Sequence, residues 1–180
     1  YRFHLLGTLG AIALWNSPFI YPFRLFMAIV HEVCHAAAAI VPGGEVLEMT
    51  THWDESGHTL TIGGLFPVIS AAGYVGTDVL GELNIRTGEI PQLQRFVLAA
   101  FGAASMVMTM WYTPFGDMDS FLGIFGGLLL LYMAIKSERA SRVAATWFGI
   151  ILCLYSLHDF RTDLWLYSEM TVAWILARHW

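Results

Sequence analysis

The sequence predicts an all-α integral membrane protein of about six membrane helices, with a small β-hairpin after the second helix. Of its 180 residues, 57% are apolar and only 13% are charged, which is more apolar than ordinary soluble folds. The apolar residues gather in runs long enough to cross, or nearly cross, a bilayer. We expect a multi-pass protein surrounded by lipid, with one membrane-embedded domain over residues 1–180.

Six apolar runs define the expected helices, at residues 3–20, 23–41, 65–81, 94–112, 121–135 and 143–158. The first run is interpreted as a retained helix, because no small-residue cleavage pattern follows it. Glycines in the third and fifth runs provide smooth surfaces where helices can approach closely. Cys34 and Cys153 lie in apolar runs, which favours small buried hydrophobes over a disulfide. The tryptophan-rich segment 164–180 is expected to lie at the membrane interface.

The segment between the second and third runs predicts the hairpin. It reads "PGGEVLEMTTHWDESGHTLTIGG", with β-forming residues on both sides of a polar "DESG" turn. Backbone with free edges is tolerated at membrane depth only where protein or a water-filled cavity surrounds it, so the hairpin should lie at the surface or line a cleft. It is either a plain connection or an edge with which a substrate strand pairs.

The charged residues predict an orientation and exclude one class of partner. A net charge of -5 with scattered arginines provides no basic stripe for nucleic acid. The basic residues fall at alternate helix ends that share one side, which should be cytoplasmic. The hairpin, "TPFGDMDS" and "HDFRTD" are expected on the opposite, acidic side. The basic set is Arg24, Arg86, Arg95, Lys136, Arg139 and Arg142.

The second run contains the motif that carries chemistry, "HEVCH", formed by His31, Glu32 and His35. H-E-x-x-H spacing places two imidazoles on one helical face, one turn apart, where both can reach one metal ion. Glu32 is placed to take a proton from a water that zinc makes more acidic. Ionisable groups in a hydrocarbon helix are costly and usually mark a site. The alternative is that both histidines only form hydrogen bonds to neighbouring helices.

A catalytic zinc needs a third protein ligand and an open position, and three aspartates are candidates. Asp159 follows the 143–158 run, on the side towards which the "HEVCH" helix runs. Asp117 follows a proline and glycine break on the same side. Asp78 lies inside an apolar run and ranks third, because a polar role in helix packing explains it equally well. Asp119 is expected to be an ordinary interfacial charge.

Four ordered segments resemble the site-2 protease-like intramembrane zinc metalloproteases, specifically their compact peptidase M50B-like branch. "HEVCHAAAAIVPGGEV" resembles the branch's H-E-x-x-H-A helix with its glycine pair and β segment, and "DESGHT" is similar to its aspartate and glycine turn. "SAAGYVGTDVLG" resembles its A-G-Y-x-G element. "FGIILCLYSLHDFRTDL" resembles its late helix, which ends in tyrosine and aspartate. The resemblance covers residues 27–164.

The resemblance implies a zinc metalloendopeptidase that cuts membrane-protein or peptide substrates within or beside the bilayer. His31 and His35 would be metal ligands and Glu32 the general base. The branch's late aspartate aligns with Asp159, which the resemblance therefore favours as third ligand. Asp117 is only loosely related to the N-x-x-P-x-x-x-D-G motif of other site-2 proteases, because "YTPFGDMD" lacks the asparagine and the aspartate-glycine pair.

Two other functions are compatible with the sequence. The first is a noncatalytic membrane subunit that keeps the metalloprotease fold and docks into a larger membrane complex through its tryptophan-rich surface. The zinc content of the purified protein distinguishes such a subunit from the enzyme. The second is a metal or proton transporter, which has no special need for a glutamate directly after the first histidine.

Overall fold

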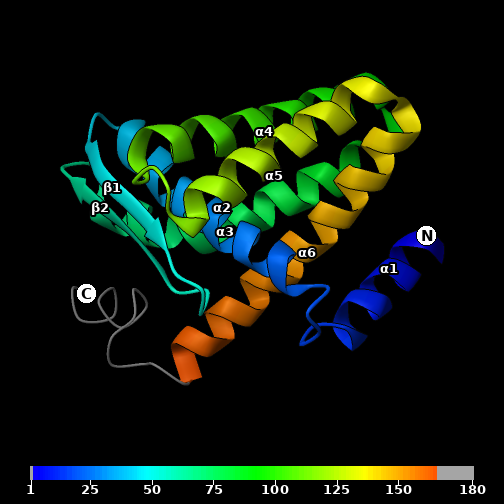
Figure 1. Ribbon diagram of the computed structural model, residues 1–180, viewed down its shortest axis with the longest axis horizontal. Coiled ribbons are helices and arrows are strands. Elements are labelled where there is room, and N and C mark those ends of the chain that lie inside the picture. The colour runs from blue at the N-terminus through cyan, green and yellow to red at the C-terminus, as the bar shows by residue number, and fades with distance from the viewer. Residues whose placement is uncertain (1, 166–180) are drawn as a thin grey trace.

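The structure is a computed structural model that describes residues 2–165 (Figure 1). Within that range it contains six α-helices, one short 3₁₀ helix (η1) and two β-strands, which confirms the expected mainly helical fold. The interfacial segment expected over residues 164–180 lies almost entirely outside the described residues. The elements in chain order are α1 Arg2–Ala13, α2 Tyr21–Ile40, β1 Glu45–Thr51, β2 Gly57–Ile62, α3 Phe66–Arg86, η1 Thr87–Glu89, α4 Pro91–Tyr112, α5 Met118–Lys136 and α6 Glu138–Trp165.

Four of these helices are long and apolar enough to cross a membrane: α2, α4, α5 and the part of α6 over Glu138–Thr162. Each of the five runs after the first corresponds to one of the helices α2 to α6. The first run was expected to continue to residue 20, but α1 ends at Ala13. Turns follow it, because Asn16 and Ser17 favour turns and the residue before Pro18 is driven out of the helical region.

Small residues bring the helices together, as the glycine spacing predicted. On α3, a Cβ at Gly76 would lie 2.7 Å from Cys34 Sγ, and one at Gly81 would lie 2.6 Å from Cys153 Sγ. Both cysteines are free and pack as small side chains. On α5, a Cβ at Gly127 would overlap the backbone of α4 at Gly102. Since such distances are below van der Waals contact, a larger side chain would force these helices apart.

β1 and β2 form the predicted hairpin, an antiparallel pair that runs from Glu45 opposite Ile62 to Thr51 opposite Gly57. The strands pack against α2, and β1 also contacts α4 and α5. Val46 and Met49 of β1 are buried. In the turn, Glu55 has a φ of 71°, a left-handed conformation that is unusual for a residue other than glycine. The hairpin therefore lies along α2, the helix that carries the "HEVCH" motif.

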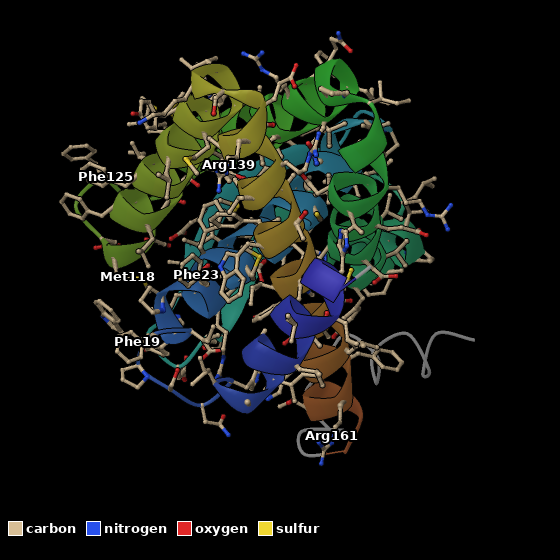
Figure 2. All side chains as sticks on the ribbon, turned by 90° about the vertical axis from the view of Figure 1, so that its right-hand side faces the viewer. Phe19, Phe23, Met118, Phe125, Arg139 and Arg161 are labelled. Atoms are coloured by element: carbon tan, nitrogen blue, oxygen red, sulfur yellow. The ribbon has the colours of Figure 1, made fainter. Side chains whose placement is uncertain are left out.

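Helix α2 forms the centre of the molecule. Of its side chains, Met27, Ile29 and Val30 are fully buried, and α3, α4, α5, α6 and both strands contact it (Figure 1). Phe23 packs edge-on against Phe148 of α6, with ring centroids 5.7 Å apart. The outer faces of the bundle are apolar and exposed, as lipid-facing surfaces are; Figure 2 shows Phe19 and Phe125 projecting from the surface.

One part of the expected orientation is wrong. Arg24 was placed on the basic side, opposite the acidic hairpin, but its guanidinium lies 2.6 Å from the Glu55 carboxylate in the hairpin turn. The strands run back along α2 after that helix ends, so the turn reaches the level of the first turns of α2. The positions of the basic residues in the sequence placed Arg24 on the basic side, because they do not reveal its long-range contact with Glu55.

Candidate metal centre

His31, Glu32 and His35 lie next to one another on α2 and are buried, with 7%, 5% and 8% of their surfaces exposed. The helical spacing brings the two imidazoles together, with ring centroids 4.7 Å apart. One ring nitrogen of each histidine and one carboxylate oxygen of Glu32 lie within 4.8 Å of one another. Such a group of donor atoms can hold a metal ion.

The environment of His35 fixes its tautomer. Its Nδ1 lies 2.6 Å from the carbonyl oxygen of Ile69 at the start of α3. A carbonyl oxygen only accepts hydrogen bonds, so Nδ1 carries the proton and Nε2 keeps a lone pair. Metal-ligating histidines generally donate their other ring N–H in this way, which fixes the ring and makes it a better ligand.

Asp159 of α6 lies beside His31. Its Oδ2 is 3.3 Å from His31 Nδ1, and this buried nitrogen has no hydrogen-bond partner within the described residues. Two ligands about 2.1 Å from one tetrahedral zinc lie about 3.4 Å apart. The separation of these two atoms is compatible with two ligands of one ion and equally with a direct ion pair between Asp159 and a protonated His31.

Two aromatic side chains and a glycine enclose His31. Reasoning from the residues gave neither tyrosine a role and gave the glycine only a role in helix packing. The Tyr74 ring packs edge-on against His31 at 5.0 Å, and the Tyr155 ring lies at 6.5 Å. A Cβ at Gly73 would overlap the His31 imidazole. The sequence contained one signal for Tyr155. It lies four residues before Asp159 on α6, and this spacing places both side chains on one helical face.

Strand β2 holds the carboxylate of Glu32. The Thr59 hydroxyl lies 2.7 Å from Glu32 Oε2 and 3.1 Å from the Glu32 carbonyl oxygen. A Cβ at Gly57 would lie 2.6 Å from Glu32 Oε1, so only glycine leaves room for the carboxylate there. The sequence predicted the hairpin but not this contact, which joins residues 27 positions apart.

The other aspartates are placed differently from Asp159. Asp117 and Asp78 are exposed, whereas Asp159 is half-buried and lies 3.3 Å from His31. The donor group of His31, Glu32 and His35 includes none of the three aspartates. Asp119 was expected to be an interfacial charge, but only 2% of its surface is exposed. It accepts hydrogen bonds from the backbone N–H groups of Thr51, at 2.9 Å, and Ser120, at 3.0 Å. Asp119 therefore ties the end of β1 to α5.

The hairpin turn is anchored to the first turns of α2. Glu55 accepts two hydrogen bonds from Arg24, at 2.8 and 2.6 Å, and the Tyr21 hydroxyl donates to the Trp53 carbonyl oxygen. Burial raises the pKa of the Glu55 carboxyl, and the hydrogen bonds and charge of Arg24 oppose this effect. A paired arginine stabilises a half-buried carboxylate that would otherwise be costly.

The residues present fit a zinc ion. Two imidazole nitrogens and a carboxylate oxygen are the donor set of many catalytic zinc sites, with one position left open. The unpartnered Nδ1 of His31 and the oriented Nε2 of His35 both have a lone pair to offer. The glycine at position 73 leaves space for the His31 ring. A metal ion held by these residues could support metal-assisted hydrolysis.

A family model described as Peptidase M50B-like matches residues 5–173, nearly the whole chain. No curated protein and no solved structure matches the chain. The matched range contains the "HEVCH" motif, the hairpin and Asp159, in agreement with the resemblance found in the sequence. With four apolar helices long enough to span a bilayer, the protein is an integral multi-pass membrane protein. It belongs to the Peptidase M50B-like family.

Proposed function

We propose that the protein is a zinc-dependent endopeptidase that cleaves membrane-protein segments, with His31, His35 and Asp159 as metal ligands and Glu32 as general base. The observation that carries this proposal is the 3.3 Å approach of Asp159 Oδ2 to an otherwise unpartnered His31 Nδ1. This contact sets a carboxylate of α6 beside one of the two imidazoles of α2.

Zinc in this site would polarise the scissile carbonyl and lower the pKa of the attacking water. Glu32 then accepts the proton that the water loses and passes it to the leaving amine. Thr59 holds the carboxylate of Glu32 in one orientation through its 2.7 Å hydrogen bond. The Ile69 carbonyl oxygen holds the His35 ring in place. These contacts fix the reacting groups before substrate binds.

The substrate is proposed to be an extended segment of a membrane protein. A helix hides its carbonyl groups in intrahelical hydrogen bonds, so a segment must unwind before it can be cut. The hairpin has two strands, and each has an edge without a partner strand in the described part of the chain. An extended segment can add to such an edge as a further strand. The hairpin contacts Glu32 directly, so a segment bound there would lie beside the base.

A noncatalytic membrane subunit is the alternative, and zinc content with activity separates the two. The full chain is purified in mild detergent, its zinc is measured by mass spectrometry, and cleavage of fluorescein-labelled casein is followed. Glu32→Gln should bind zinc as the parent does but lose at least about a hundredfold in rate, because general-base catalysis contributes this much.

Glu48→Gln is the matched control, because it removes an exposed carboxylate from β1. It should keep both zinc and activity. A parent protein without zinc would favour the noncatalytic subunit, and unchanged cleavage by Glu32→Gln would exclude Glu32 as the base.

A further inference from the structure

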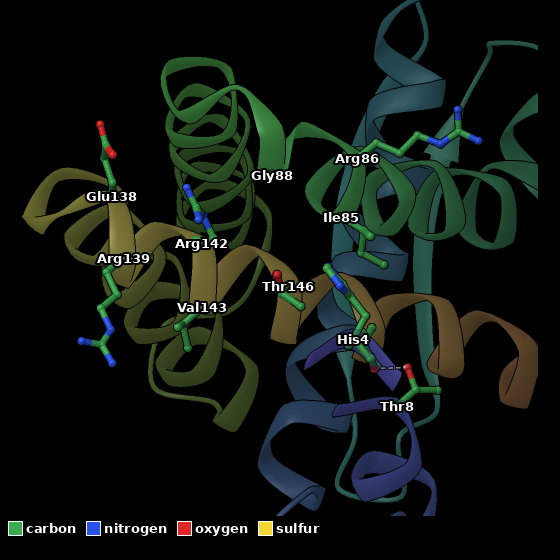
Figure 3. Close-up of a pocket in the computed structure, with 11 residues that line it drawn as sticks. His4, Thr8, Ile85, Arg86, Gly88, Glu138, Arg139, Arg142, Val143 and Thr146 are labelled. Carbon is green, nitrogen blue, oxygen red and sulfur yellow. Dashed lines mark hydrogen bonds between the residues drawn. The ribbon is translucent and has the colours of Figure 1, made fainter. Parts of the chain in front are cut away.

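A cavity of about 1110 Å³ lies between α1, the end of α3 and the first turns of α6 (Figure 3). The proposed metal centre does not border it. On α6, Asp159 and Arg139 are 20 positions apart, which is about 30 Å along a helix axis. This length matches the hydrocarbon core of a bilayer, so the cavity opens near the membrane surface opposite the level of Asp159. Figure 2 shows Arg139 and Arg161 at opposite ends of the molecule.

The mouth of the cavity is positively charged. Three arginines line it against one carboxylate, that of Glu138. Arg86 pairs with Glu82 at 2.7 Å. Arg139 and Arg142 are exposed and make no hydrogen bond or ion pair within the part of the chain that the structure describes. Two guanidinium groups on adjacent turns of one helix are therefore available to an anion, and the fork of an arginine matches phosphate well.

The cavity becomes more buried and less charged along α6. Arg142, Thr146 and Ile150 line it at positions four residues apart on α6, which places them in one row along the helix. Arg142 is exposed, whereas 3% of the Thr146 surface and 5% of the Ile150 surface are exposed. Ile85 of α3 extends the apolar wall, and Figure 3 shows His4 of α1 projecting towards it. The cavity thus has an exposed, positively charged end and a more buried end where Ile85 and Ile150 lie beside Thr8 and Thr146.

The gap exists because α1 packs on α6 and on no other element of residues 2–165. No helix fills the space between α1 and α3. The outward face of α1 carries Leu5, Leu6 and Leu9, which are 61%, 69% and 54% exposed, so lipid surrounds this region. In a bilayer, an apolar gap of this kind is filled by an acyl chain or by another helix, and the arginines at its mouth favour an anionic headgroup.

We propose that this cavity binds one anionic phospholipid, with its phosphate at Arg139 and Arg142 and an acyl chain in the gap between α1 and α3. A volume of about 1110 Å³ is too large for a lone phosphate ion and suits a headgroup with the first part of a chain. Anionic lipid bound here would hold α1 against the bundle. The proposal does not depend on the protein being a peptidase.

The test uses the full chain in neutral detergent, supplied with equal amounts of phosphatidylglycerol and phosphatidylcholine. Bound lipid is identified by native mass spectrometry. The parent should retain phosphatidylglycerol over phosphatidylcholine by about tenfold or more, since each arginine near a membrane surface contributes on the order of 1 kcal/mol. Arg139→Gln with Arg142→Gln should abolish the preference. Arg161→Gln removes one positive charge from the far end of α6 and should leave the preference unchanged.

Two further measurements identify the source of the phosphate. Glycerol 3-phosphate at millimolar concentration should not displace the lipid, and Thr8→Trp, which fills the gap from α1, should reduce lipid retention. Displacement by glycerol 3-phosphate would instead indicate a site for a soluble phosphate compound. Equal retention of the two lipids by the parent, or an equal loss in Arg161→Gln, would overturn the proposal. Retention of another protein in place of lipid would assign the gap to a partner helix.

Discussion

At the scale of single residues, each ionisable side chain of the "HEVCH" motif lies against a distant segment. His35 donates to the Ile69 carbonyl oxygen, His31 lies beside Asp159, and Glu32 accepts from Thr59. A charged group at the centre of a membrane helix costs on the order of 3 kcal/mol on insertion scales. These contacts offset that cost and also fix the orientation of each group, so the same interactions would serve both stability and the proposed reaction.

Thr59 is expected to position the base without taking part in the chemistry. Thr59→Val keeps the shape of the side chain but removes the hydrogen bond to Glu32 Oε2. A hydrogen bond to a charged group contributes about 1.5–3 kcal/mol. If this free-energy contribution is lost from the transition state, the rate falls by about tenfold to a hundredfold. Steady-state cleavage of labelled casein should show the loss in kcat rather than in KM, with zinc content unchanged.

Thr59→Ser restores the hydroxyl and should recover most of the activity. Thr61→Val changes the same side chain two residues further along β2, on the same face of the strand, and should remain active. A Thr59→Val protein that keeps the parental kcat would remove Thr59 from the mechanism.

At the scale of elements, the site depends on how closely α3 approaches α2. Gly73 and Gly76 face His31 and Cys34, one helical turn apart along both helices. Helix packing in membranes relies on such small residues, since lipid provides no hydrophobic drive for helices to associate. The same approach brings the Ile69 carbonyl oxygen within 2.6 Å of His35. The glycines thus determine the position of His35, a proposed metal ligand, through the spacing between two helices.

Gly73→Ala tests this dependence. The added Cβ would overlap the His31 ring, and overpacking of this kind costs about 1–3 kcal/mol. If the ring turns or α3 moves away, the geometry of the donor group is lost. We expect zinc affinity to fall by about tenfold to a hundredfold, as it does when groups around a metal ligand are altered. Competition with a fluorescent zinc chelator measures the change.

Gly10→Ala is the matched control, because no atom lies within 4 Å of a Cβ at that position of α1. It should leave zinc affinity unchanged and stabilise α1 slightly, by about 0.5–1 kcal/mol. Parental zinc affinity in Gly73→Ala would show that the spacing of α2 and α3 does not control the site.

At the scale of the whole molecule, local patterns predicted the elements, whereas most contacts between them could not be predicted. Apolar runs identified α2 to α6, and a polar turn between β-forming residues identified the hairpin. Asp119 resembled a surface charge because nothing near it in the sequence shows that Thr51 will donate to it. Arg24 was assigned to the wrong side because its partner Glu55 lies 31 residues away. Such contacts follow from tertiary packing, which local periodicity does not encode.

The proposed metal centre would join segments that are far apart in the chain, so a bound zinc should stabilise the whole bundle. His31 and His35 belong to α2, and Asp159 belongs to α6. A ligand at a hundred times its Kd stabilises the folded state by about 2.7 kcal/mol. For a chain of this size, that corresponds to a Tm shift of about 5–10 °C. Removing zinc with 1,10-phenanthroline should lower the Tm of the parent by this amount, measured in detergent by tryptophan fluorescence.

The aspartate variants show which carboxylate completes the site. Asp159→Asn should bind less than half the parental zinc and respond weakly to phenanthroline, because a neutral amide is a poorer ligand for zinc. Asp117→Asn changes the same side chain at an exposed position and should behave like the parent. His31→Ala should show no response to the chelator, since one of the two imidazole ligands is missing. If Asp117→Asn loses zinc while Asp159→Asn keeps it, the third ligand comes from the start of α5, and α6 only orients His31.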